Sequence, residues 1–441
     1  RKIPEGFPKS LKEHMGKSVS AIDDPLCDKH DSYGEHMSSL LLEGLDELDI
    51  KYVHKTAHET YKNGLLQEQI HKILSNWEKV GDIIKELTDQ TKFQEVYPYA
   101  AVCAGCGKIY TTKATDYLQD ERRIVYKCET TTIGYKTPLE GCGHEGEADI
   151  TKDDGKLAWK VEFAARWQAF DIRFEAYGKD IMNSVEVNDK VSEKILNFRR
   201  PTHVKYEMFL DKGGKKISKS LGNVVTSQKW LDYGTPKSIL LLLYKRIKGA
   251  REVGFEDIPA LMDEYNELEN IYFGKTKVDN EAKLVKSKGL YEYVNLLNPP
   301  KNSSTHVSYR LLIELCKIFK DDRLERIASK LIDYGTIKET NSNVEDLIKL
   351  AGNYSDDFEE TKIPGTKFTI DDSAKDALRQ LTDILSKDEK IEDLQNSIYT
   401  IAKENQVQPR DFFRILYQII LSTDRGPKIG PFIEDIGKKK V

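Results

Sequence analysis

Residues 203–223 read HVKYEMFLDKGGKKISKSLGN, and this stretch decides the predicted fold. The apolar pattern from His203 to Leu210 predicts a β-strand that leads directly into a turn with two adjacent glycines. Glycine lets the backbone turn sharply and approach a ligand closely. The side chains that follow offer cations and hydrogen-bond donors to phosphate oxygens: Lys215, Lys216, Ser218, Lys219 and Ser220. The stretch therefore predicts a mobile loop that binds a polyanion; an exposed basic hairpin fits the charge pattern equally well.

The chain upstream alternates between strand and helix patterns. We expect strands over 160–163 and 173–177, the second ending at Gly178, and helices over 164–170 and 191–198. Together with the strand before the basic loop, these segments form half of a doubly wound nucleotide-binding sheet. Residues 1–69 hold too little strand pattern to supply the other half, so we expect part of it to precede residue 1. The predicted fold class is α/β, a Rossmann-type parallel sheet.

The remaining segments are predicted to be mainly helical. Apolar residues over 70–92 recur at three- and four-residue spacing, which predicts an amphipathic helix. From about residue 236 onward helical periodicity dominates and predicts an all-α C-terminal domain. In that region Ser373 is expected to cap one helix, and Pro409 fits the first turn of another. A chain of 441 residues has room for about three domains.

Four of the six cysteines predict a metal site: Cys103, Cys106, Cys128 and Cys142. The CxxC-Gly pair at Cys103 is typical of a structural zinc knuckle, and two further thiols follow within forty residues. His144 is a reserve ligand, and buried thiols without metal are the alternative. Cys27 and Cys316 stand alone in the sequence, and six cysteines are too few for a disulfide scaffold.

The segment KISKS, residues 216–220, resembles the KMSKS loop of class I aminoacyl-tRNA synthetases, with Ile in place of Met. The flanking sequences narrow this resemblance to the archaeal-type class I lysyl-tRNA synthetases. The similar stretches are YEMFLDKGG from Tyr206, LGNVVT from Leu221, FED from Phe255, RKIPEG from Arg1, SYGEH from Ser32 and GPKIGPF from Gly426. The resemblance spans nearly the whole chain. It implies a loop that closes over ATP and stabilises the charge on the leaving pyrophosphate.

The resemblance also assigns roles to individual residues. It implies catalytic roles for Lys216, Ser218, Lys219 and Ser220, and ATP binding by Gly178, Asp180, Lys216 and Lys219, where Gly178-Lys-Asp180 is similar to the GxD element of the family. It places Trp167 near the bound lysine, although an indole in a helix–sheet core is an equal alternative. Ile181 stands where the family often has a histidine, which puts the amino-acid pocket in doubt.

The resemblance further implies contacts with tRNA by a basic patch, Arg246, Lys248 and Arg251. By charge alone, the solvated end of a helix explains this patch slightly better. The family also needs a HIGH-type sequence whose histidines contact ATP phosphates. None of the nine histidines has that context, so we expect the element upstream of Arg1.

These inferences divide the chain into five parts. The predicted domains are 1–95, the incomplete first half of the catalytic Rossmann domain; 96–150, the zinc-binding insertion; 151–235, the second half with the KISKS loop; 236–290, a helical connecting region that contacts the tRNA stem; and 291–441, an all-helical anticodon-binding domain.

The function predicted by the resemblance is that of a lysine–tRNA ligase with ATP, Mg²⁺ and a structural Zn²⁺, whose partners are lysine and tRNA(Lys). Two alternatives are a glutamyl-type class I synthetase and a non-catalytic tRNA-binding relative. No apolar run is long enough for a membrane span and no secretory signal is visible, so we expect a soluble, cytoplasmic protein. The sequence leaves the oligomeric state open.

Overall fold

The computed structural model describes residues 3, 7–133, 137–217, 224–246, 249–358, 370–386, 393–421, 424, 426–438 and 441. Ser218, Lys219, Ser220 and Lys248 lie outside these residues. The chain divides into two compact units, one made of residues 1–224 and 247–252 and the other of residues 225–246 and 253–441. Each unit buries apolar side chains of its own.

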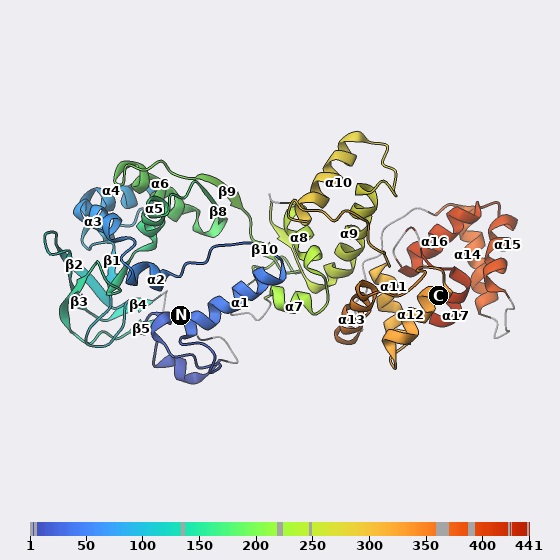
Figure 1. The fold of residues 1–441 in the computed structure, drawn as a ribbon, viewed down its shortest axis with the longest axis horizontal. Helices are drawn as coiled ribbons and strands as arrows, with labels where there is room; N and C mark the ends of the chain where they lie inside the picture. Colours follow the sequence, from blue (N-terminus) through green and yellow to red (C-terminus); the bar gives the residue numbers. More distant parts are fainter. Residues whose placement is uncertain are drawn as a thin grey trace. The chain divides into compact units, whose positions relative to one another are not determined.

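The first unit combines helices with short strands (Figure 1). Its elements are the short 3₁₀ helices η1 (Lys9–Lys12), η2 (Val19–Ala21), η3 (Lys92–Gln94) and η4 (Lys179–Ile181); the α-helices α1 (Tyr33–Glu47), α2 (Ala57–Lys62), α3 (Gln67–Ser75), α4 (Trp77–Thr88), α5 (Trp159–Ala169) and α6 (Met182–Lys194); and the strands β1 (Tyr99–Ala101), β2 (Thr112–Leu118), β3 (Arg123–Cys128), β4 (Thr131–Ile133), β5 (Thr137–Leu139), β6 (Glu145–Asp149), β7 (Gly155–Leu157), β8 (Phe174–Gly178), β9 (Thr202–Tyr206), β10 (Phe209–Leu210) and β11 (Arg251–Glu252).

The strands of this unit pair in several small sheets. The sheet β2-β3-β6 is antiparallel, and so are the pairs β1-β7 and β4-β5. The pairs β8-β9 and β10-β11 are parallel. Helices α3 to α6 gather beside these strands (Figure 1), and their apolar faces share one buried cluster with β1, β3 and β7, to which Ile73, Ile84 and Val161 belong. The fold is therefore mixed α/β with small sheets and many helices.

Two predictions for this unit are wrong in detail. Residues 160–163 are helical and belong to α5, because Val161, Ala164 and Ala165 form one buried helix face. The helix expected over 191–198 begins at Met182 and ends at Lys194. The pattern over 70–92 is helical as expected but is divided at Asn76 into α3 and α4. In the described part of the chain, the region predicted to form the parallel sheet contains one pair of parallel strands, β8-β9. A doubly wound sheet is therefore not confirmed.

The second unit is helical, as the periodicity after residue 236 predicts. Its elements are α7 (Ser227–Leu231), α8 (Pro236–Tyr244), η6 (Phe255–Asp257), α9 (Ile258–Tyr272), α10 (Glu281–Val294), α11 (Tyr309–Ile318), α12 (Arg323–Asp333), α13 (Ser342–Asp357), α14 (Asp372–Leu385), α15 (Leu394–Glu404), α16 (Pro409–Leu421) and α17 (Ile429–Ile436).

Local signals set the helix starts in this unit. Helix α16 begins at Pro409, as predicted, because proline lacks only an N–H that the first turn leaves unpaired. The cap of α14 is Asp371, whose carboxylate accepts the N–H of Ala374, and not Ser373 as expected from sequence. Within the described residues, every helix is too short or too polar for a bilayer crossing.

Candidate functional site

The parallel pair β8-β9 ends in a glycine followed by an acidic residue. Gly178 closes β8 and pairs with Tyr206 at the end of β9, and Asp180 follows in η4. A Cβ atom on Gly178 would lie 2.7 Å from Asp180 Oδ1 and 3.3 Å from the Tyr206 ring. A larger residue at position 178 would therefore require the exposed Asp180 carboxylate to move from its place over the strand end. Ligands of α/β folds bind at this position, beyond the carboxyl ends of parallel strands.

A tight turn follows β10. The Asp211 carboxylate accepts the N–H groups of Gly213 and Lys215, each at 2.9 Å. Gly214 has a positive φ of 72°, a conformation that glycine adopts without strain. Lys216 then forms a β-bridge with Leu210, which ties the start of the KISKS segment back to β10. The described part of the basic loop is thus a hydrogen-bonded turn with exposed lysines.

Trp167 lies in the interior behind β8. It is 2 % exposed, and its indole N–H donates to Glu175 Oε2 at 3.3 Å. Its ring centroid lies 5.4 Å from that of His203, whose Nε2 lies 2.7 Å from Asp189 Oδ1. Arg200 also donates to Asp189, at 3.0 Å. Sequence reasoning selected none of these partners, because only the fold brings α5, α6, β8 and β9 together.

The four predicted metal ligands converge in the strand-rich part of the first unit. Their sulfur atoms all lie within 4.8 Å of one another. The Sγ atoms of Cys103 and Cys142 are 3.5 Å apart, and those of Cys106 and Cys128 are 3.8 Å apart. Gly107 has a φ of 70°, the positive value that a knuckle requires. Burial raises the pKa of the Cys103 thiol to about 12, so a nearby cation is needed to hold it as a thiolate. A tetrahedral Zn²⁺ fits this donor set.

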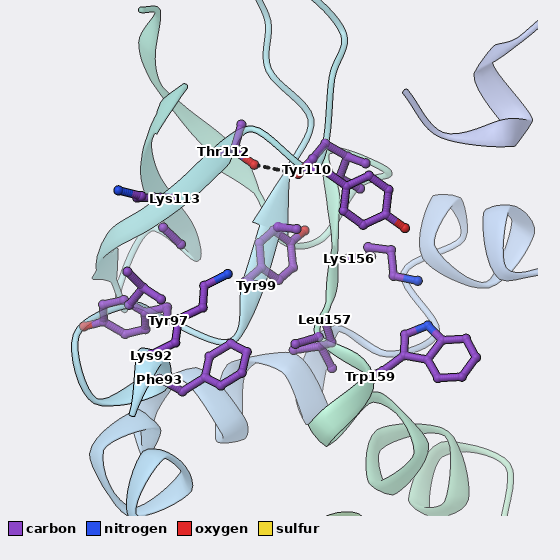
Figure 2. A pocket seen from close by; sticks show the side chains of 15 residues that line it. Lys92, Phe93, Tyr97, Tyr99, Tyr110, Thr112, Lys113, Lys156, Leu157 and Trp159 are labelled. Carbon is purple, nitrogen blue, oxygen red and sulfur yellow. Dashed lines mark hydrogen bonds between the residues drawn. The ribbon is translucent and has the colours of Figure 1, made fainter. Parts of the chain in front are cut away.

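A cavity of about 240 Å³ opens between β1, β2, β7 and the start of α5 (Figure 2). Its lining is rich in aromatic and lysine side chains: Phe93, Tyr97, Tyr99, Tyr110, Trp159, Lys92, Lys113 and Lys156. The Tyr99 hydroxyl is buried and has no hydrogen-bond partner among the described residues. Burial, followed by the nearby Asp154, raises the pKa of Tyr99, so this hydroxyl keeps its proton and remains available as a donor.

The predicted basic patch is divided between the units. Arg246 follows α8 in the second unit and is exposed. Arg251 lies in β11 of the first unit, with its guanidinium 4.9 Å from the centre of the Phe209 ring, a cation–π contact. The two arginines therefore belong to different compact units of the chain. Lys248 is outside the described residues.

The family profile described as "tRNA synthetases class I (K)" matches residues 1–296. A lysine–tRNA ligase of Cenarchaeum symbiosum (strain A) is 56 % identical over 442 residues, which cover 100 % of this chain and 83 % of the relative. A lysine–tRNA ligase of Methanocaldococcus jannaschii is 29 % identical over 99 % of this chain and 85 % of its own length.

One solved structure, a glutamate tRNA ligase from Elizabethkingia meningosepticum, aligns with 91 % of this chain and 87 % of its own. The sequence identity is 12 % and the TM-score is 0.28. A score this low carries no argument about the fold or the substrate.

Proposed function

Because the chain belongs to the class I tRNA synthetases of the lysine type, we propose that the end of the β8-β9 pair binds ATP and that the segment after β10 closes over its phosphates. The family sets the reaction, which is the ligation of lysine to tRNA(Lys) at the expense of ATP. The lysine carboxylate attacks the α-phosphorus of ATP, and pyrophosphate leaves. A ribose hydroxyl of the terminal adenosine then attacks the lysyl carbonyl, and AMP leaves.

The single observation that carries this proposal is the position of Asp180, directly beyond Gly178 at the end of the parallel β8-β9 pair. The exposed Asp180 carboxylate can accept hydrogen bonds from ribose hydroxyls there. We assign β8 and β9 to the second half of a Rossmann-type sheet. Mg²⁺ accompanies ATP and neutralises charge on its phosphates. The protein aligns the reactants and stabilises the leaving group, so positioning and electrostatics supply the rate.

Charge on the leaving pyrophosphate requires cations nearby. Lys216 is exposed and begins the KISKS segment, which the bridge to Leu210 holds next to β10. We propose that Lys216, Ser218, Lys219 and Ser220 contact the phosphates when the loop closes.

The lysine side chain needs a counter-charge for its ammonium group. Glu175 is a candidate, because its carboxylate lies beside Trp167 on the strand that ends at Gly178. Asp189 is less suited, since Arg200 and His203 already contact it. We propose that Trp167 and Glu175 border the amino-acid pocket.

We propose that Cys103, Cys106, Cys128 and Cys142 bind a structural Zn²⁺ within an inserted module, residues 96–150. Four thiolates would leave no open coordination position, so the metal would hold the knuckles together and take no part in the chemistry. We propose that residues 1–95 and 151–235 form the catalytic domain. Residues 236–290 would form the connecting region, and residues 291–441 would bind the anticodon.

We propose that the aromatic cavity beside this module binds an unpaired base of tRNA. Aromatic faces stack on splayed bases, and the buried Tyr99 hydroxyl offers a donor to a base edge. Lys113 and Lys156 form ion pairs with Glu129 and Glu162, so the binding depends more on stacking than on net charge. Arg246, Lys248 and Arg251 are proposed contacts to the tRNA backbone, and the cytoplasm is the proposed compartment.

Exchange of pyrophosphate into ATP tests the first half-reaction. Across the twenty amino acids, we expect exchange with lysine and not with glutamate. In Lys219→Ala, lysine-dependent exchange should fall by about 100-fold or more, because a cation that stabilises the transition state is lost. The matched control, Lys212→Ala, removes a lysine seven positions earlier in the sequence and should stay within about threefold of the wild type.

An unaltered exchange rate in Lys219→Ala would remove the loop from the mechanism. Exchange with glutamate, or tRNA binding without any exchange, would overturn the assignment of the reaction itself.

Metal analysis tests the four-cysteine site. Cys106→Ser should lose one equivalent of zinc relative to the wild type, because a neutral hydroxyl replaces a thiolate ligand. Cys316→Ser removes a buried thiol from the other unit and should keep the full metal content. Equal zinc in Cys106→Ser and in the wild type would contradict the site.

Steady-state aminoacylation tests the aromatic cavity. Trp159→Ala should raise the KM for tRNA by about tenfold through the loss of stacking, with lysine-dependent exchange unchanged. Tyr52→Ala removes another exposed aromatic ring of the same unit and serves as the control. A change in exchange without a change in the KM for tRNA would contradict this role.

A further inference from the structure

A polar pair of side chains lies between the β8-β9 strands and the helices that pack on them. His203 of β9 is the residue paired with Glu175 of β8, so both side chains project from the same face of the strand pair. His203 Nε2 lies 2.7 Å from Oδ1 of Asp189, which belongs to α6. The side chain of His203 is 13 % exposed and that of Asp189 is 11 % exposed. Packed layers of helices and strands ordinarily place apolar side chains at such positions.

The carboxylate that contacts His203 is itself fixed. Arg200 donates to Asp189 Oδ2 at 3.0 Å, so each carboxylate oxygen has a partner. The neighbouring Asn188 is completely buried, and its side-chain oxygen accepts the N–H of Ala164 in α5 at 2.8 Å. Because this bond joins α6 to α5, Asp189 has a defined position relative to the side chains of both helices.

The ring of His203 contacts two aromatic side chains. Its centroid lies 5.4 Å from that of Trp167, at an interplanar angle of 49°. It lies 5.5 Å from the ring of Tyr177, at 78°, which is an edge-to-face contact. The second ring nitrogen, Nδ1, lies 3.4 Å from the backbone carbonyl oxygen of Glu175. With one nitrogen at Asp189 and the other at the strand, the imidazole has little freedom to rotate, and it limits the freedom of the indole beside it.

Trp167 in turn fixes a carboxylate. Its indole N–H donates to Glu175 Oε2 at 3.3 Å, so one oxygen of Glu175 is held by the indole and the second can serve an ammonium group. The plane of the Glu175 carboxylate therefore follows the orientation of the indole. The contacts run in one series, from Asp189 to His203, then to Trp167 and finally to Glu175.

Stability alone does not call for a polar pair at this place. An apolar side chain at residue 203 would fill the space without the cost of taking an imidazole and a carboxylate out of water. A hydrogen-bonded pair, however, restricts the orientation of a ring more narrowly than apolar contacts do, because hydrogen bonds depend on direction. The pair therefore suits a place where the orientation of neighbouring side chains matters.

We propose that His203, held by Asp189, is a positioning residue for the binding of lysine. It fixes the indole of Trp167 and, through the indole, the carboxylate of Glu175. This inference rests on the proposed amino-acid pocket, which Trp167 and Glu175 border. His203 acts through these two side chains and not by contact with the substrate, so it affects the binding of lysine and leaves the nucleotide site at Asp180 unaltered.

Steady-state aminoacylation by the whole protein tests this role. In His203→Ala, the KM for lysine should rise about tenfold and the KM for ATP should stay within about twofold, because only the lysine pocket loses its alignment. His203→Phe fills the space of the ring and loses the bond to Asp189, so it tests the proposal without opening a cavity. In this variant the KM for lysine should rise at least about threefold, again without a matching change for ATP.

The matched control is His71→Ala. His71 is a partly buried histidine of the same unit, and its Nδ1 lies 2.7 Å from the hydroxyl of Tyr117. Both KM values should stay within about twofold of the wild type in this control. Equal increases in the KM for lysine and for ATP in the His203 variants would indicate general damage to the fold and would overturn the positioning role.

A double-mutant cycle with Trp167→Phe separates positioning from an independent effect on the fold. Trp167→Phe removes the N–H that holds Glu175. If His203 acts through Trp167, adding His203→Phe to Trp167→Phe should change the KM for lysine by less than about twofold. Effects that multiply in the double variant would overturn the proposal.

The same set of variants also tests the pocket on which the inference rests. An unaltered KM for lysine in Trp167→Phe would overturn the pocket itself, and the positioning role with it. An increased KM for lysine in Trp167→Phe, together with an unaltered KM in both His203 variants, would overturn the positioning role alone.

Discussion

The parallel pairing of β8 with β9 is the constraint on which the proposed site depends. It places Gly178 opposite Tyr206, so that two strands end at the same edge and one of them ends without a side chain. A Cβ atom at that point would displace Asp180 or the tyrosine ring. With glycine at position 178, the carboxylate lies over the strand end without displacement.

Elsewhere in the first unit, polar and metal-ligating groups supply contacts that an apolar core does not. The apolar cluster of the first unit joins α3 to α6 with the neighbouring strands. Cys103 and Cys128 belong to that cluster, Cys106 packs against it, and Cys142 is exposed. Loops that carry ligands need positions fixed to a fraction of an ångström, and short strands alone do not provide this rigidity. The four-cysteine metal site and the Asp211 turn would each fix one such loop.

The sequence predicted motifs better than it predicted elements. The spacing of the four cysteines predicted their convergence, which the structure confirms. KISKS and GxD were identified through the resemblance to a family, and their roles stay predictions. The segment 160–163 was predicted as a strand and is helical. Four residues are too few to distinguish the period of a helix from that of a strand. The cap of α14 is Asp371 and not Ser373. Aspartate and serine are both common capping residues, and both lie near the helix start, so the sequence did not distinguish them. Glu175 and Asp189 were missed, because their partners lie on other elements of the fold.

The claim that glycine at position 178 makes space for the nucleotide can be measured directly. Isothermal titration calorimetry would compare the binding of a non-hydrolysable lysyl-adenylate analogue to the wild type and to Gly178→Ala. The added methyl group lies within 2.7 Å of Asp180 Oδ1, so the account predicts at least a tenfold weaker Kd, with an unchanged unfolding temperature. Equal affinity in the two proteins would contradict the proposed nucleotide site at this edge.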